Sequence, residues 1–363
     1  MRQERNSMRS TVLKHVRSIM SPPVSDFFNV QEIAGAGRGV IASLRIPVGT
    51  VIFDSEPPAA HVIFRQYRKE VCAYCFRYDR GRTLPVRDAS VGKVFCDTSC
   101  QEKWQRNEGD LGVAAWRALQ NFTQANSKAV EDTWSDAPKT GKPDAEKVGR
   151  HWSDVAQQVD AFGEQTTKRS NNKNGSSKLL KPFMKQINPD ILGLFLSGVI
   201  FHHRQPEDWK SGVLCLAMDH EPYRSVEDLE AHCNGFVQLN SILPPELQSS
   251  CSADLCRVIA EAGSHNAFGI RSGSEDGEEY MGWAIYPSAS YFNHSCSPNL
   301  MKRRVGSAWE FWTAWELEAG KQCCISYLGG DEKDLTPAER RQRLKEAWEF
   351  ECMCERCQRE AAE

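Results

Sequence analysis

The first part of the chain alternates between apolar and polar residues in short runs. Residues 27–64 are expected to form β-structure, because Val40 to Leu44 and Thr50 to Phe53 are short, strand-like runs bounded by turn residues. The turns are Gly35 to Gly39, which is rich in glycine, and Pro47-Val48-Gly49. A module containing four cysteines follows at residues 72–104, with a short helix expected at Gln101–Gln105.

From Gly109 to about Ala262 the apolar spacing becomes helical. Helices are expected at Leu111–Phe122, Ile191–Phe201 and Ala253–Ala262. Between the first two, residues 126–178 are dominated by Ser, Asn, Lys, Asp and Pro, and the run from Arg169 to Ser177 is too polar to pack. We therefore expect a mobile surface loop over about 126–178.

Strands are expected again between Phe268 and Tyr327. The last helix is expected at about Pro337–Phe350, since Thr336 and Glu339 have capping-box spacing and Pro337 occupies the first helical position.

The charge balance excludes two classes of partner. The 363 residues carry 45 basic and 48 acidic side chains, for a net charge of −3, so no overall field attracts nucleic acid or a membrane surface. The longest apolar run, Ile191–Phe201, is too short to cross a bilayer. The first twenty residues are rich in Arg, as in mitochondrial transit peptides and in disordered tails; we interpret residues 1–26 as a basic flexible tail.

The 14 cysteines indicate metal binding rather than disulfides, because no export signal is present and eight of them fall into clusters. The first cluster has C-x2-C and C-x3-C spacing: Cys72, Cys75, Cys96, Cys100. The second supplies three thiolates in a C-x-C-x2-C run, Cys352, Cys354 and Cys357, and tetrahedral zinc needs a fourth.

The glycine-rich turn allows two interpretations. A Rossmann fingerprint needs GxGxxG at the start of a helix, whereas here GxGxG precedes a strand-like run. An ordinary hairpin turn remains the simplest interpretation of these glycines taken alone.

Three motifs in a fixed order identify a family. The loop Asn293-His294-Ser295-Cys296-Ser297-Pro298-Asn299 lies between strand-like runs, Ile325-Ser326-Tyr327 follows it, and the cysteine run of 352–357 closes the series. This order resembles the SET domain of protein lysine methyltransferases, especially SMYD-type and fungal relatives. The resemblance implies an α+β, β-rich SET fold of small sheets with an NHSC pseudoknot, a helical insert, and zinc-binding finger and post-SET segments.

The same resemblance assigns the site. Implied contacts to S-adenosylmethionine come from Gly37, Arg38, Gly39, Asn266, Asn293, His294, Tyr327 and Phe350. The implied catalytic and lysine-channel residues are Tyr327, Phe268 and Trp348. Trp348 departs from the family, which commonly has a tyrosine there, and this leaves the number of methyl groups transferred open.

Tyr327 is the residue expected to act in the chemistry. A lysine amine attacks a methyl group only when neutral, yet its ordinary pKa is about 10.4. A narrow aromatic channel disfavours the ammonium by desolvation, and a tyrosine hydroxyl can orient the amine lone pair. The aromatic faces also attract the sulfonium and the methylated product, by about 0.5–2 kcal/mol per contact.

The resemblance also completes both metal sites. It supplies Cys296 as the fourth ligand of the C-terminal cluster, so that zinc would hold the tail over the loop at residue 296 and position Phe350. The first cluster resembles half of a MYND finger, since the inner CxxC pair and the final His-x3-Cys are absent. We expect two zinc ions, the first of them fixing a structural loop.

The expected organisation therefore has six parts: residues 1–26, a tail; 27–70, the first SET part; 71–106, a degenerate MYND-like finger; 107–264, a helical insert; 265–330, the second SET part; 331–363, a post-SET helix and zinc segment. The implied function is methyl transfer to a lysine of a histone or non-histone protein. The alternative is a catalytically inactive protein-binding module. We expect a monomer in the nucleus, the cytoplasm or both, without direct contact to nucleic acid or membrane.

Overall fold

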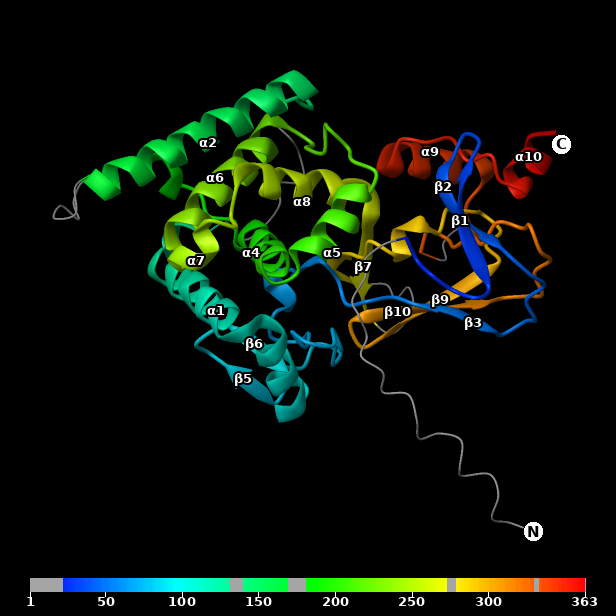
Figure 1. Ribbon diagram of the computed structural model, residues 1–363, viewed down its shortest axis with the longest axis horizontal. Coiled ribbons are helices and arrows are strands. Elements are labelled where there is room, and N and C mark those ends of the chain that lie inside the picture. The colour runs from blue at the N-terminus through cyan, green and yellow to red at the C-terminus, as the bar shows by residue number, and fades with distance from the viewer. Residues whose placement is uncertain (1–21, 131–139, 169–180, 273–278, 330–332, 363) are drawn as a thin grey trace, which may run out of the picture.

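The computed structural model describes residues 22–130, 140–168, 181–272, 279–329 and 333–362. These residues form two halves, one built mainly of helices and one mainly of small antiparallel sheets (Figure 1). The α+β class is thereby confirmed. Among the described helices, none has the length and apolar character needed to cross a membrane.

The strands of the described residues form four small sheets. Their bounds are β1 (Phe28–Ile33) with β2 (Gly37–Ala42); β3 (Val51–Asp54) with β10 (Ala308–Thr313) and β9 (Leu300–Val305); β4 (Ala60–Ile63) with β8 (Tyr280–Ile285) and β7 (Ala267–Arg271); and β5 (Val86–Asp88) with β6 (Lys93–Phe95). The predicted strand regions are confirmed. Two sheets combine strands from the beginning and the end of the chain, so the strand half closes only when distant segments meet.

Aromatic side chains fill the core of the strand half. Phe292 lies 4.7 Å from Phe311 and 5.3 Å from Phe53, centroid to centroid. Phe28 packs against the edge of Phe292 at 5.6 Å. These rings come from β1, β3, β10 and the segment just before the NHSC loop, and the loop therefore begins from a rigid base.

The helices have these bounds: α1 (Thr98–Ala125), α2 (Ala145–Lys168), α4 (Pro189–Arg204), α5 (Pro206–Ser211), α6 (Val226–Ile242), α7 (Pro245–Gln248), α8 (Ala253–Asn266), α9 (Pro337–Trp348) and α10 (Glu355–Ala362). The helices predicted at 191–201, 253–262 and 337–350 correspond to α4, α8 and α9. The capping box of α9 is present, since Thr336 and Glu339 satisfy each other's backbone N–H groups.

Helix α4 is the centre of the helical half. Asn188 caps its first turn by accepting from the N–H groups of Asp190 and Ile191. The helix is buried nearly all round because α1, α6, α8 and β4 surround it. Gly198 allows the close approach, since a Cβ there would lie 2.4 Å from the Cδ1 atom of Ile259.

The expected loop over 126–178 is wrong in its central part, which forms helix α2. Its buried side chains Val148, Trp152 and Val155 recur at helical spacing and pack into the helical core. Trp152 also donates a hydrogen bond to the hydroxyl of Tyr223 at 2.9 Å. The polar composition of the segment concealed this three-residue apolar stripe; residues 131–139 and 169–180 lie outside the described part.

The cysteine module packs into the same core as the helices. Buried Cys72, Phe95 and Trp104 belong to one apolar cluster with α4, α6 and α8. The short helix expected at 101–105 is continuous with the one expected at 111–122, and both lie in α1, which is broken at Gly109. The finger is therefore built onto the helical half.

The expected tail at residues 1–26 is described only from residue 22 onwards. There the hydroxyl of Ser25 donates to the carbonyl of Ile52 at 2.9 Å, so this end of the segment is attached to β3.

Candidate functional site

The NHSC loop and the segment that ends at Tyr327 cross and are hydrogen-bonded together. The N–H of Ser295 donates to the carbonyl of Ile325, and the N–H of Ile325 donates to the carbonyl of Asn293, both at 3.0 Å. The side-chain oxygen of Asn299 accepts from the N–H of Cys324 at 2.7 Å. This ladder places the loop and the tyrosine side by side.

His294 is the central residue of the crossing. Its Nδ1 accepts the N–H of Tyr327 at 3.0 Å, so the ring carries its proton on Nε2, which lies 3.2 Å from the sulfur of Cys296. Burial lowers the pKa of His294 to about 4, and the ring is neutral at physiological pH. One imidazole thus connects the tyrosine segment to a predicted metal ligand.

Three aromatic side chains surround the end of this segment. The ring of Tyr327 lies 5.2 Å from that of Trp348 and meets Phe350 nearly at right angles at 6.4 Å. The phenol donates to the carbonyl of Phe292 at 3.1 Å, and burial raises the pKa of Tyr327. The tyrosine is therefore a neutral hydroxyl held by a backbone acceptor.

A cleft of about 1130 Å³ opens beside these rings. Its lining contains most of the predicted site residues: Gly37, Arg38, Asn266, Asn293, His294, Tyr327, Trp348 and Phe350. Gly39 and Phe268 are not part of that lining. The volume is large enough for a nucleoside-sized ligand.

The glycine-rich turn meets the NHSC loop at the cleft. Gly37 has a φ of +65°, which favours glycine, whereas Gly39 is needed for space, since a Cβ there would lie 2.6 Å from the side-chain nitrogen of Asn293. That nitrogen donates to the carbonyl of Arg38 at 3.3 Å. The guanidinium of Arg38 lies 4.9 Å from the centre of the Tyr291 ring and donates to its hydroxyl at 2.9 Å.

Two predicted residues have neighbours that the sequence did not indicate. The amide nitrogen of Asn266 donates to the carbonyls of Ala217 and Ala262, both at 2.8 Å, which holds the segment at Ala217 over the cleft. Phe268, the predicted channel wall, packs against Tyr286 at 5.6 Å and Trp309 at 5.8 Å. It shares an apolar cluster with Tyr327 but does not reach the cleft.

Among the lining residues that the sequence did not predict are Tyr291, Ala217 and His265. Tyr291 lies two residues before Asn293, so its closeness to the NHSC motif could have indicated it. Ala217 and His265 belong to the helical insert, where no motif marks them.

The C-terminal cysteine cluster is assembled as predicted. The sulfur atoms of four cysteines all lie within 4.8 Å of one another: Cys296, Cys352, Cys354 and Cys357. The sulfur of Cys296 is 3.8 Å from that of Cys352 and 3.6 Å from that of Cys357. The tail thus meets the NHSC loop at this cluster.

A buried arginine, Arg340, lies beside this cluster. Arg340 is only 1% exposed, and it contacts Glu360 and donates to the carbonyl of Leu335 at 2.7 Å. Burial lowers the pKa of Arg340, but hydrogen bonds to Glu360 and to the thiols of Cys296 and Cys357 outweigh this and raise it. The cluster therefore has a buried positive charge beside it.

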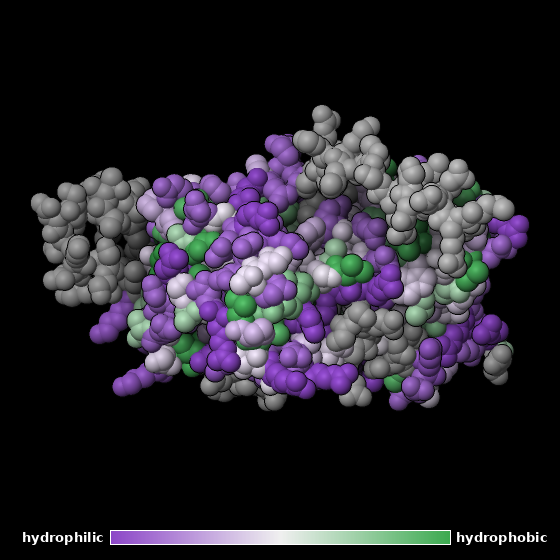
Figure 2. Space-filling view, turned by 90° about the horizontal axis from the view of Figure 1, so that it is seen from below, coloured by the Kyte–Doolittle hydropathy of each residue, from purple (hydrophilic) through white to green (hydrophobic). Residues whose placement is uncertain are grey.

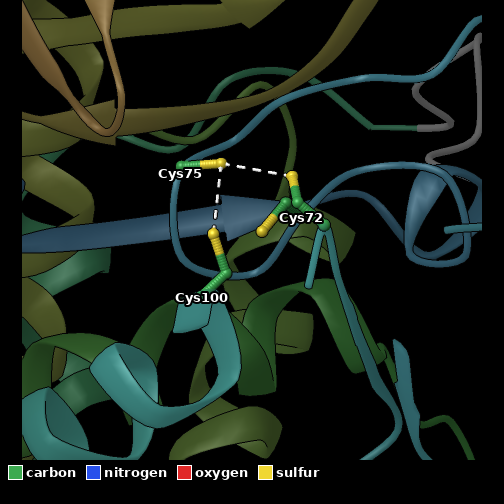
Figure 3. Close-up of side chains that lie close together, drawn as sticks. Cys72, Cys75 and Cys100 are labelled. Atoms are coloured by element: carbon green, nitrogen blue, oxygen red, sulfur yellow. Dashed lines mark hydrogen bonds between the residues drawn. The ribbon is translucent and has the colours of Figure 1, made fainter. Parts of the chain in front are cut away.

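The finger cysteines form a second group of four. Figure 3 shows the sulfurs of Cys72, Cys75 and Cys100 close together. The sulfur of Cys75 lies 3.6 Å from that of Cys96 and 3.9 Å from that of Cys100. A hydrogen bond from Cys75 lowers the pKa of Cys72 to about 5, so one thiol of the group ionises readily.

Both groups fit zinc. Tetrahedral zinc with bonds of about 2.3 Å separates its sulfurs by about 3.8 Å, close to the separations in each cluster. All of these thiols are free and none is paired in a disulfide. The donor set of four cysteines is also one that structural zinc prefers.

The cleft and the crossed segments beside it define a site for a small molecule. The C-terminal tail covers part of this site, and a metal ion in the thiol cluster could hold the tail in place. Residues 37–328 match the SET domain family. The chain therefore belongs to this family, as its motifs predicted.

Relatives that match most of this chain or part of it are named as lysine methyltransferases. The chain is 26% identical to the potential protein lysine methyltransferase SET6 of Saccharomyces cerevisiae, over 93% of this chain and 96% of that protein. It is 32% identical to the histone-lysine N-methyltransferase ASHR2 of Arabidopsis thaliana, over 90% of this chain and 71% of that protein. A match of 34% identity covers 42% of this chain and 30% of the histone-lysine N-methyltransferase SMYD3 of Mus musculus.

Proposed function

We propose that this chain is a protein-lysine N-methyltransferase that uses S-adenosylmethionine. The observation that carries the proposal is the position of Tyr327, a half-buried neutral phenol that packs against Trp348 in the lining of the cleft. The family and the relatives named as lysine methyltransferases support the same activity.

The cofactor, when bound, supplies an electrophilic methyl group on a sulfonium. The backbone at Gly37 and Arg38, together with Asn293 and His294, would hold it in the cleft, and Phe350 would cover it. The three aromatic rings exclude water, which favours the neutral form of an incoming lysine amine. The hydroxyl of Tyr327 is fixed by the carbonyl of Phe292, so it is placed to orient that amine.

Zinc in the C-terminal cluster would act on structure rather than on the reaction. It would attach residues 352–357 to the loop at Cys296, and this places Phe350 over the cleft. Zinc in the finger would hold Cys72 and Cys100 together and so stabilise the helical core.

The substrate is a protein or peptide lysine, in a histone or a non-histone protein. The proposal includes a monomeric state and a location in the nucleus, the cytoplasm or both for this protein. The protein contacts neither nucleic acid nor a membrane directly. On the face shown in Figure 2, apolar residues are scattered among polar ones rather than gathered into one broad area.

The test is transfer of a radiolabelled methyl group from S-adenosylmethionine to a library of lysine-containing peptides and proteins. Tyr327→Phe should lower transfer by about 10- to 100-fold, since it removes the orienting hydroxyl. Tyr223→Phe is the matched control, because it removes a buried hydroxyl from the helical core, outside the cleft lining.

Equal transfer by Tyr327→Phe and the parent protein would refute the role of the phenol. Cofactor binding without transfer to any substrate would instead support the inactive binding module.

A further inference from the structure

The turn after helix α9 carries an acidic side chain between the two aromatic residues of the tail that line the cleft. Trp348 and Phe350 line the cleft, and Glu349 lies between them outside its lining. Glu349 ends the helix with a φ of 58°, a left-handed conformation in which glycine is the usual residue. A glutamate in this strained conformation indicates that a contact of its side chain offsets the conformational free energy that the backbone costs.

The side chain of Glu349 points to the helical insert. Its carboxylate accepts from the ammonium of Lys142 at 2.9 Å. Polar atoms of Asp219, His265 and Glu349 all lie within 4.8 Å of one another. His265 itself lines the cleft, so this polar group lies where the insert, the tail and the cleft meet.

Lys142 comes from a segment that is attached to its surroundings on both sides. On one side, the hydroxyl of Thr140 donates to Glu227 at 2.5 Å and accepts from the N–H of Val226 at 3.0 Å. On the other side, the N–H of Ala145 donates to Glu221 at 3.1 Å. The ammonium is therefore presented from a fixed piece of backbone.

Lys142 also settles the charge of the group. The carboxylates of Asp219 and Glu349 would repel each other unless a positive charge lay between them. A bound metal ion could supply that charge, and it is the alternative to the ion pair with Lys142. The ammonium of Lys142 already supplies positive charge there, while Asp219 accepts from the hydroxyl of Ser264 at 2.7 Å and from the N–H of Glu221 at 2.8 Å. The partners are protein groups, which favours a structural contact over a metal site.

We propose that the ion pair of Lys142 and Glu349 is a latch that connects the helical insert to the post-SET turn and holds Trp348 and Phe350 against the cleft. Both residues are positioning residues, since neither lines the cleft. The inference rests on the proposed function only in taking S-adenosylmethionine as the ligand of the cleft.

The expected effect is modest. The side chains of Lys142 and Glu349 are 45% and 54% exposed, and exposed pairs contribute little because water screens them. Loss of the latch should weaken binding by about two- to five-fold, without abolishing it.

The experiment measures the affinity for S-adenosylhomocysteine by calorimetry and the melting temperature of the same samples. Lys142→Met, Glu349→Gln and the double variant should each weaken binding by the same factor of about two to five, because either change breaks the single pair. Lys142→Arg should retain most of the affinity.

Glu349→Gly separates positioning from general stability. Glycine suits the left-handed backbone, so the melting temperature should stay equal or rise, while the affinity falls. Glu146→Gln is the control, since it breaks the exposed pair with Arg150 on α2, where neither residue lines the cleft, and should leave affinity unchanged.

Additive losses in the double variant, unchanged affinity in the single variants, or an equal loss in Glu146→Gln would each overturn the latch. Amide hydrogen exchange of residues 347–351 gives a second readout that needs no ligand. Faster exchange in Lys142→Met than in the parent supports the latch even if the parent fails to bind S-adenosylhomocysteine, an outcome that would refute the proposed cofactor instead. Unchanged exchange refutes the latch.

Discussion

The Nδ1 atom of His294 accepts the backbone N–H of Tyr327 at 3.0 Å, across 33 residues of sequence. The contact fixes the tautomer of the imidazole and directs its other nitrogen to the sulfur of Cys296. The cleft, the phenol and the thiol cluster therefore depend on one ring.

Replacing His294 should affect stability and cofactor binding together. His294→Ala leaves the N–H of Tyr327 without its acceptor, which should cost about 1–3 kcal/mol of the free energy of unfolding. His294→Asn retains a side-chain acceptor near the Nδ1 position and should lose less. Urea denaturation and calorimetry with S-adenosylhomocysteine measure both effects, and equal behaviour of the two variants would contradict the assigned contact.

The two thiol clusters should respond differently to loss of a ligand. Cys357→Ser should remove one zinc and abolish most cofactor binding, because Phe350 is no longer held over the cleft. Cys100→Ser should also remove one zinc but mainly lower the melting temperature, since the finger shares the helical core. Zinc content, cofactor affinity and melting temperature are measured for both variants. If Cys100→Ser lost cofactor binding and Cys357→Ser lost only stability, the assigned roles of the two clusters would be wrong.

Arg340 should influence how firmly the C-terminal cluster holds its metal. Four thiolates around one zinc carry a net negative charge, and the buried guanidinium beside Cys296 and Cys357 offsets part of it. Arg340→Met should speed zinc loss to a chelator by about 10-fold, and Arg340→Lys by less. Lys345→Gln, an exposed change on the same helix, is the control. Identical chelation kinetics for all variants would exclude a role for the charge.

Gly39 should be intolerant of even a methyl group. A Cβ at this position would lie 2.3 Å from the Cδ1 of Ile33 and 2.6 Å from the Nδ2 of Asn293, so Gly39→Ala should displace Asn293 and weaken cofactor binding by about 10-fold or more. Gly141→Ala is a suitable control, since a Cβ there meets nothing within 4 Å. Unchanged binding in Gly39→Ala would mean that Asn293 is not needed.

Trp348 should set how many methyl groups are added. Trp348→Tyr adds a hydroxyl near Tyr327 that can hold the amine by a hydrogen bond, and a held amine turns less freely for a second transfer. We expect a larger share of monomethylated product, measured by mass spectrometry of a methylated substrate. An unchanged product distribution would place Trp348 outside the channel.

Much of the site was predictable from sequence because its signals are local. The capping box of α9 depends on Thr336 and Glu339, three residues apart, and the thiol spacings of each cluster likewise lie within short segments. The order of the NHSC loop, Tyr327 and the final cysteines identified the family and, through it, the pairing of Cys296 with the tail.

Other features depended on contacts between distant segments. Helix α2 is stabilised by three buried residues in a polar sequence, and only the surface of α6 and α8 gives them a core to enter. Phe268 matches its motif, yet packing against Tyr286 and Trp309 places it away from the cleft lining. The latch at Glu349 and the closure by Ala217 follow no motif at all.

The sequence by itself determined the family, the two groups of cysteines that could hold zinc and the start of helix α9, since these follow from residue types in recognisable patterns. Only the tertiary structure decided which side chains reach the cleft and what holds the tail across it. The physical reason is that burial and long-range ion pairs depend on surfaces that exist only after distant parts of the chain have packed together.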